Sequence, residues 1–130
     1  AGLGEYVHLL VADATDPQTV DAVVAEFGDR MPQLIVRDST HDYRLTKREL
    51  GLWVPRMDSQ SILLINGTSR LSSGWDESGR GGPRKALRDW MRRRRDVDYL
   101  SLNERVGEHG LEDPPLAYAD GCGLGILQKR

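Results

Sequence analysis

Three polar segments, each directly behind an apolar run, carry the side chains best suited to chemistry in this chain. They are Asp13-Ala14, residues 38–41 (Asp-Ser-Thr-His) and residues 66–69 (Asn-Gly-Thr-Ser). Asp38 and His41 could act as a base, an acid or a metal ligand, and Asp13 could accept a hydrogen bond from an amine or a hydroxyl group. A purely structural role is the alternative for these residues. Asp13 could simply cap the next helix, and His41 could be an ordinary surface residue.

The remaining histidines, cysteine and glycines carry weaker signals. Residues 121–125 (Gly-Cys-Gly-Leu-Gly) resemble a phosphate-binding loop, but no helix follows them, so these glycines predict a hairpin. Cys122 has no histidine nearby in the sequence and is interpreted as a structural thiol. His8 lies within an apolar run, where it alternates with hydrophobic residues, and this pattern predicts a buried core histidine. His109 has no partner at a spacing that suggests a metal site.

A basic segment is the strongest local charge feature. Arginines occupy residues 92–95, and further cations precede them at Arg80, Arg84, Lys85 and Arg88. Such a segment could bind phosphate or an acidic partner. The alternative is a solvated helix end, where cations interact favourably with the helix dipole and the acidic residues that follow neutralise the charge.

Alternating apolar runs and helical patterns must position these side chains. Apolar runs rich in β-forming residues predict strands at residues 6–12, 33–36, 61–65 and 97–102, and a final strand pair at residues 116–119 and 123–128. Helices are predicted from Pro17 to a stop at Gly28, over residues 43–54, and from Pro83 onward. The glycine- and serine-rich residues 68–82 predict a long, mobile loop.

This order of elements predicts a doubly wound α/β fold. The sheet is expected to be mostly parallel, with helices on both faces and an antiparallel C-terminal strand at or near an edge. Ligands of such sheets bind beyond the carboxyl ends of the strands. Asp13, Asp38 and Asn66 are therefore expected to meet in one shared crevice.

Composition bounds the class of protein. The 130 residues, 38% hydrophobic and 29% charged, suffice for one packed core, so residues 1–130 are predicted to form a single domain. A net charge of −2 does not favour nucleic-acid or membrane-surface binding, and no apolar stretch is long enough to span a membrane. The lone cysteine fits a reducing compartment and predicts a cytoplasmic protein. The start at Ala1, without a methionine, leads us to expect an N-terminally incomplete domain.

Several of these segments together resemble a known family. They are residues 2–14, 34–43, 48–55, 62–68, 82–90 and 123–127. In this order they resemble the rear two thirds of a class I S-adenosylmethionine (SAM)-dependent methyltransferase with a Rossmann-like fold. The most similar group is the small-molecule O-methyltransferases that include cephalosporin hydroxylase-like and macrocin O-methyltransferase-like proteins. The resemblance extends over nearly the whole chain.

The resemblance implies SAM as the cofactor and a hydroxyl group of a natural product or sugar as the methyl acceptor. It places Asp13, Ala14 and Asp38 at the cofactor, and Asp38 with His41 at the acceptor hydroxyl as catalytic residues. The family's first two strands and its glycine-rich loop have no counterpart here. Metal-dependent members carry carboxylates where this chain has Thr40 and Gly67, so no metal is expected.

These departures leave other functions open. The chain could be a non-catalytic descendant of the fold that acts as an interaction or regulatory domain. It could also be a phosphate or nucleic-acid binder that uses the arginines at residues 92–95, although nucleic acid is the less expected partner. A parallel sheet without its first strands would leave an open edge, so another segment or a second chain is expected to complete the sheet.

Overall fold

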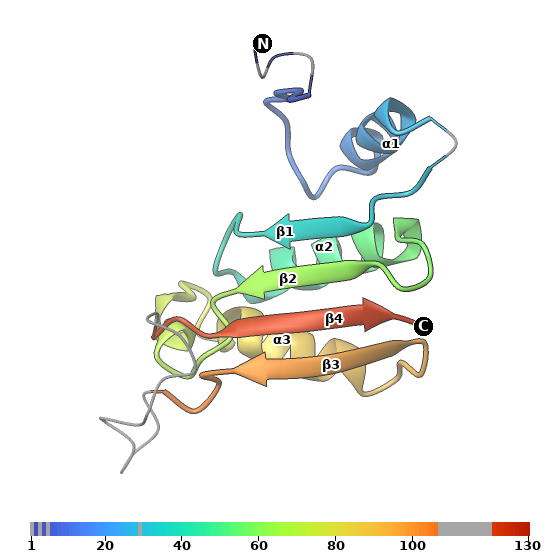
Figure 1. Cartoon of the computed structure of the whole chain (residues 1–130). Coiled ribbons are helices and arrows are strands. Elements are labelled where there is room, and N and C mark those ends of the chain that lie inside the picture. The colour runs from blue at the N-terminus through green and yellow to red at the C-terminus, as the bar shows by residue number, and fades with distance from the viewer. Residues whose placement is uncertain (1, 3, 5, 29, 107–120) are drawn as a thin grey trace.

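A four-stranded mixed sheet forms the centre of the computed structural model, which describes residues 2, 4, 6–28, 30–106 and 121–130. The strand order is β1-β2-β4-β3, where the strands are β1 (Leu34–Arg37), β2 (Ile62–Asn66), β3 (Val97–Leu102) and β4 (Leu124–Lys129). β1 and β2 are parallel, and β4 runs antiparallel to both β2 and β3. Three strands therefore point the same way and the C-terminal strand opposes them, as predicted (Figure 1). The C-terminal strand lies next to the edge strand β3, which agrees with its expected place at or near an edge.

Helices α1 (Pro17–Glu26) and α2 (Tyr43–Trp53) begin and end where local signals predict. Asp16 caps α1 by accepting a hydrogen bond from the Gln18 amide, and Gly28, with φ of +63°, follows its end. Asp42 caps α2 by accepting hydrogen bonds from the amides of Arg44 and Leu45, at 2.7 and 2.8 Å. Such caps satisfy amide groups that have no partner within the first helical turn.

The core lies between the sheet and the pair formed by α2 and α3 (Gly82–Met91), which pack side by side across one face (Figure 1). Alternate strand residues point toward these helices, as the two-residue period of a strand requires. The buried core residues are Leu50, Val54, Met57, Leu63, Ile65, Leu87, Val97 and Leu127. No helix in the described part of the chain is long and apolar enough to cross a lipid bilayer.

No described helix covers the opposite face of the sheet. Leu34, Val36 and Leu100 point there and are 59%, 65% and 56% exposed. The expectation of helices on both faces is thus met on one face alone within the described residues. This open face and the unpaired outer edge of β1 are the features that a further segment or chain would cover.

The strand predicted at residues 6–12 is wrong. These residues form no strand, and Leu9 and Val11 are 91% and 94% exposed. An apolar run becomes a strand only when a neighbour pairs with it, and no described strand lies beside this one. His8 is consequently not a core histidine: its side chain is 71% exposed and lies 3.4 Å from the Glu26 carboxylate. The strand predicted at residues 116–119 and His109 lie outside the described residues.

Residues 68–82 do not form the open, mobile loop that their composition predicts. They include the short 3-10 helix η3 (Ser72–Trp75), and Thr68, Ser69 and Ser72 are fully buried. The Cys122 carbonyl accepts hydrogen bonds from the Ser69 amide at 2.8 Å and from the Ser72 hydroxyl at 3.0 Å. Small hydroxyl side chains therefore hold this segment against the chain that leads into β4.

Candidate functional site

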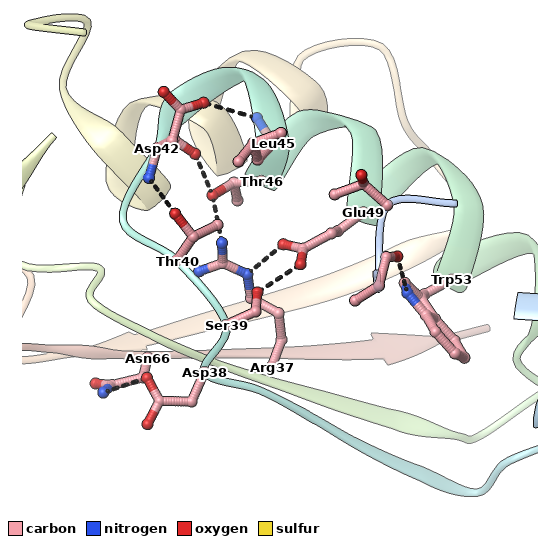
Figure 2. A network of polar contacts seen from close by, with 12 residues as sticks. Arg37, Asp38, Ser39, Thr40, Asp42, Leu45, Thr46, Glu49, Trp53 and Asn66 are labelled. Carbon is pink, nitrogen blue, oxygen red and sulfur yellow. Dashed lines mark hydrogen bonds and ion pairs between the residues drawn. The ribbon is translucent and has the colours of Figure 1, made fainter. Parts of the chain in front are cut away.

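Asp38 and Asn66 meet at the carboxyl ends of β1 and β2. The parallel register pairs Arg37 with Ile65, so the next residue of each strand reaches the same edge of the sheet. There the Asn66 side-chain amide donates a hydrogen bond of 3.0 Å to Oδ1 of Asp38 (Figure 2). Asp38 remains exposed, and its carboxylate is accessible to a ligand at this edge.

His41 lies in the turn that leads into α2 and contacts Gly67, the residue after β2. Its ring packs edge-on against Trp75, with the ring centroids 5.0 Å apart. The Nε2 atom is buried and has no hydrogen-bond partner among the residues that the structure describes. His41, Thr40 and Trp75 contribute to a hollow of about 660 Å³, here called the His41 hollow.

Gly67 provides the space for the His41 ring. A Cβ atom at this position would lie 2.8 Å from Cδ2 and 2.9 Å from Nε2 of His41, and the backbone φ is +80°. Gly67→Ala is therefore expected to destabilise the fold by more than about 1 kcal/mol and to displace the imidazole. Chemical denaturation and the NMR signals of the His41 ring would measure the two effects.

Gly51→Ala is the matched control for this substitution. Gly51 lies within α2, and a Cβ atom there would meet no other atom within 4 Å. We expect this variant to gain about 0.5–1 kcal/mol, since alanine favours a helix over glycine, and to leave the His41 signals unchanged. Equal stability of the two variants would contradict the role assigned to Gly67.

Asp13 and Ala14 do not join Asp38 and Asn66 at the end of a strand. Asp13 Oδ1 accepts hydrogen bonds of 2.8 Å from both the amide and the hydroxyl of Thr15, and these bonds lower the pKa of Asp13. It thus stabilises the turn that precedes α1 but does not cap the helix, because the cap is Asp16. The Ala14 carbonyl accepts a hydrogen bond of 3.0 Å from the Trp53 indole, which ties this turn to α2. The predicted meeting of Asp13 with Asp38 and Asn66 is wrong because no strand precedes Asp13.

Ala14 and Asp38 nevertheless line the same cavity. This apolar cavity, of about 280 Å³, lies between α1, β1 and α2. Most of its wall is hydrophobic, and members of that wall are Val23, Phe27, Leu34, Val36, Leu50 and Trp53. The cavity therefore offers an apolar slot with a carboxylate beside it.

A buried polar network that the sequence did not reveal holds the loop between β1 and α2 (Figure 2). Arg37 Nε lies 2.7 Å from the Glu49 carboxylate, and the two side chains are 7% and 3% exposed. Arg37 also donates a hydrogen bond to the Thr46 hydroxyl at 2.7 Å, and Ser39 donates one to Glu49. Thr46 and Glu49 lie three residues apart and therefore on the same face of α2. Arg37 is the last residue of β1. This spacing, together with an arginine at the end of the preceding strand, is the signal that could have indicated the network.

Two of the four arginines at residues 92–95, Arg92 and Arg94, form local ion pairs. Arg94 forms an ion pair of 2.6 Å with Asp96 and stacks over the Trp90 ring at 4.5 Å. Arg92, with a side chain that is 76% exposed, lies 3.6 Å from Asp89. These contacts favour the interpretation as a solvated helix end over a ligand-binding run.

The described residues contain no group of three or more His, Cys, Asp or Glu side chains that could hold a metal ion. Thr40 and Gly67 occupy the positions where metal-dependent methyltransferases carry carboxylates. Here the Thr40 hydroxyl accepts a hydrogen bond from the Asp42 amide, and Gly67 leaves room for the His41 ring.

No protein-family model and no curated protein sequence matches this chain. Among solved structures, an O-methyltransferase from Bacillus cereus in complex with SAH superposes with a TM-score of 0.54 at 9% sequence identity. The match covers 87% of this chain and 46% of that chain, so this chain spans about half the length of its structural neighbour. The likeness supports an α/β fold of the Rossmann-like type found in class I SAM-dependent methyltransferases.

Proposed function

We propose that this chain takes part in SAM-dependent methyl transfer to a hydroxyl group of a small molecule, such as a natural product or a sugar. One observation carries the proposal. In a fold that resembles an SAH-bound O-methyltransferase, Asp38 and His41 lie at the carboxyl ends of two parallel strands, where such folds bind ligands. Asp38 contacts Asn66, and His41 contacts Gly67.

The apolar cavity fits the nucleoside part of this cofactor. Its hydrophobic wall suits a flat purine ring, and Asp38 offers a carboxylate that can accept a hydrogen bond from a ribose hydroxyl. Ala14 lies on the same wall, and Asp13 supports it through the turn that it forms with Thr15. The described residues contain no glycine-rich loop for the methionine part. We therefore propose that a further segment or a second chain pairs with the outer edge of β1 and supplies those contacts.

His41 and Asp38 would act on the acceptor. SAM, when bound, supplies an electrophilic methyl group. His41 would take the proton of the acceptor hydroxyl as its oxygen attacks, which requires the buried Nε2 atom to become accessible to the acceptor. Asp38, oriented by Asn66, would hold the acceptor or the ribose in position.

The first test is calorimetric titration of the chain with SAM and SAH, followed by transfer of a labelled methyl group to a panel of catechols and sugars. Saturable heat together with labelled product would support the proposal. Absence of heat at millimolar cofactor would contradict it, because the proposed nucleoside site is lined by this chain's own residues, and would favour the alternative of a non-catalytic interaction domain. The exposed Leu34 and Val36 beside the open edge of β1 are the observations that support this alternative.

His41→Ala is expected to reduce turnover by about 10²–10⁴-fold, because it removes the proposed proton acceptor. The free energy of unfolding should change by no more than about 1 kcal/mol, since Nε2 donates no hydrogen bond to any described residue. His8→Ala is the matched control, because His8 is an exposed histidine that does not line the His41 hollow. Full turnover in His41→Ala, or an equal loss in both variants, would refute the role of His41.

A further inference from the structure

A third hollow, here called the basic pocket, has a volume of about 340 Å³. η3 contributes to both neighbouring hollows, since Trp75 lines the His41 hollow while Ser73 and Gly74 line the basic pocket. The proposed methyl transfer uses none of its residues. Five cationic side chains form much of its wall: Arg70, Arg80, Arg84, Lys85 and Arg88.

Among the described residues, the cations that line the basic pocket outnumber the carboxylates that form ion pairs with them. Glu104 and Asp89 form ion pairs with other members of the wall. Arg70 and Arg80, in contrast, form no ion pair with any residue that the structure describes, and both are exposed. Several cations around one hollow raise the local concentration of anions. The pocket is therefore expected to attract anions.

The cationic side chains, and not the start of α3, make this a site for anions. The Asp76 carboxylate already accepts hydrogen bonds from the amides of Arg80 and Gly82, at 3.1 and 2.8 Å. Burial alone would raise the pKa of Asp76, but hydrogen bonds from Ser78 and Gly82 outweigh it and keep the pKa below its ordinary value. A charged Asp76 thus occupies the amides at the helix start, and an anion must be bound by the guanidinium and ammonium groups.

We propose that the basic pocket binds a phosphate group of a small molecule, of the diphosphate or phosphate monoester class. Guanidinium groups form paired, charge-assisted hydrogen bonds with phosphate oxygens, and four arginines here face one hollow. A single pocket of this size suits a small ligand, whereas nucleic acids require a groove that follows their backbone. The proposal does not depend on methyl transfer, because the two sites share no residue.

The experiment is calorimetric titration of the whole chain with inorganic pyrophosphate and with inorganic phosphate in low-salt buffer. We expect saturable binding of both, with pyrophosphate tighter because it carries more charge. Arg70→Gln/Arg80→Gln should weaken pyrophosphate binding by about tenfold or more. Both side chains are exposed, so the melting temperature of this variant should match that of the wild type.

Arg93→Gln/Arg95→Gln removes the same net charge outside the basic pocket and is the matched control. This variant should bind pyrophosphate within about twofold of the wild type. Absence of pyrophosphate binding, or equal weakening in both variants, would overturn the proposal. A single-stranded oligonucleotide provides a further test. If it binds more tightly than pyrophosphate, and if both variants weaken its binding equally, the proposal would be overturned and a nucleic-acid surface would be indicated instead.

Discussion

Glu49→Ala is expected to destabilise the protein by about 3–5 kcal/mol. The substitution leaves the Arg37 guanidinium, on a side chain that is 7% exposed, without the carboxylate that lies 2.7 Å from it. An unpaired buried charge is costly because it has lost water without gaining a partner. Denaturation in urea would measure the loss, and Glu49→Gln provides a milder variant if Glu49→Ala does not fold.

Two controls separate this effect from the loss of any ion pair. Asp21→Ala removes the carboxylate of the Arg56 pair, which is also 2.7 Å long but has side chains 42% and 63% exposed. It should cost about 0–1 kcal/mol, as exposed pairs do. Arg37→Met/Glu49→Leu should recover most of the stability, since apolar residues of similar volume can replace a buried pair. Similar losses in Asp21→Ala and Glu49→Ala would show that burial does not determine the cost.

Gly123→Ala should have a similar or larger effect, of more than about 3 kcal/mol, because it combines steric overlap with an unfavourable backbone conformation. A Cβ atom at Gly123 would lie 2.3 Å from the Ser69 amide nitrogen and 2.8 Å from the Thr68 carbonyl carbon. Both are backbone atoms, which no rotamer change can move, and φ at Gly123 is +81°. We expect a large drop in melting temperature by circular dichroism.

Gly123, just before β4, lies against Thr68 and Ser69, which follow β2. The Gly123 carbonyl accepts hydrogen bonds from the amides of Gly67 and Thr68, at 3.1 and 3.3 Å. Displacing it would therefore disturb the sheet and the Gly67 position beside His41 together. Gly74→Ala is the control, because a Cβ atom there would meet nothing within 4 Å and should leave the melting temperature unchanged. A stable Gly123→Ala would mean that these two segments do not pack so closely.

Part of the candidate site was predictable from the sequence. The carboxyl ends of parallel strands lie at the same edge of a sheet, and this rule correctly predicted that Asp38 lies close to Asn66. It failed for Asp13, because an exposed apolar run was taken for a strand. It did not reveal the Arg37–Glu49 pair, since these residues lie on two different elements and come together only when α2 packs on β1. The roles assigned to Asp38 and His41 remain predictions for the experiments above.

Features that depend on neighbouring residues could be predicted from the sequence. Asp16 and Asp42 cap their helices and Gly28 follows the end of α1, because these structures need only local hydrogen bonds and local backbone preferences. The tertiary structure was needed to show which apolar runs pair, that β4 lies between β2 and β3, and that residues 68–82 are largely folded rather than open. The physical reason is that strand pairing and the burial of polar groups depend on partners distant in the sequence, whose presence no local pattern records.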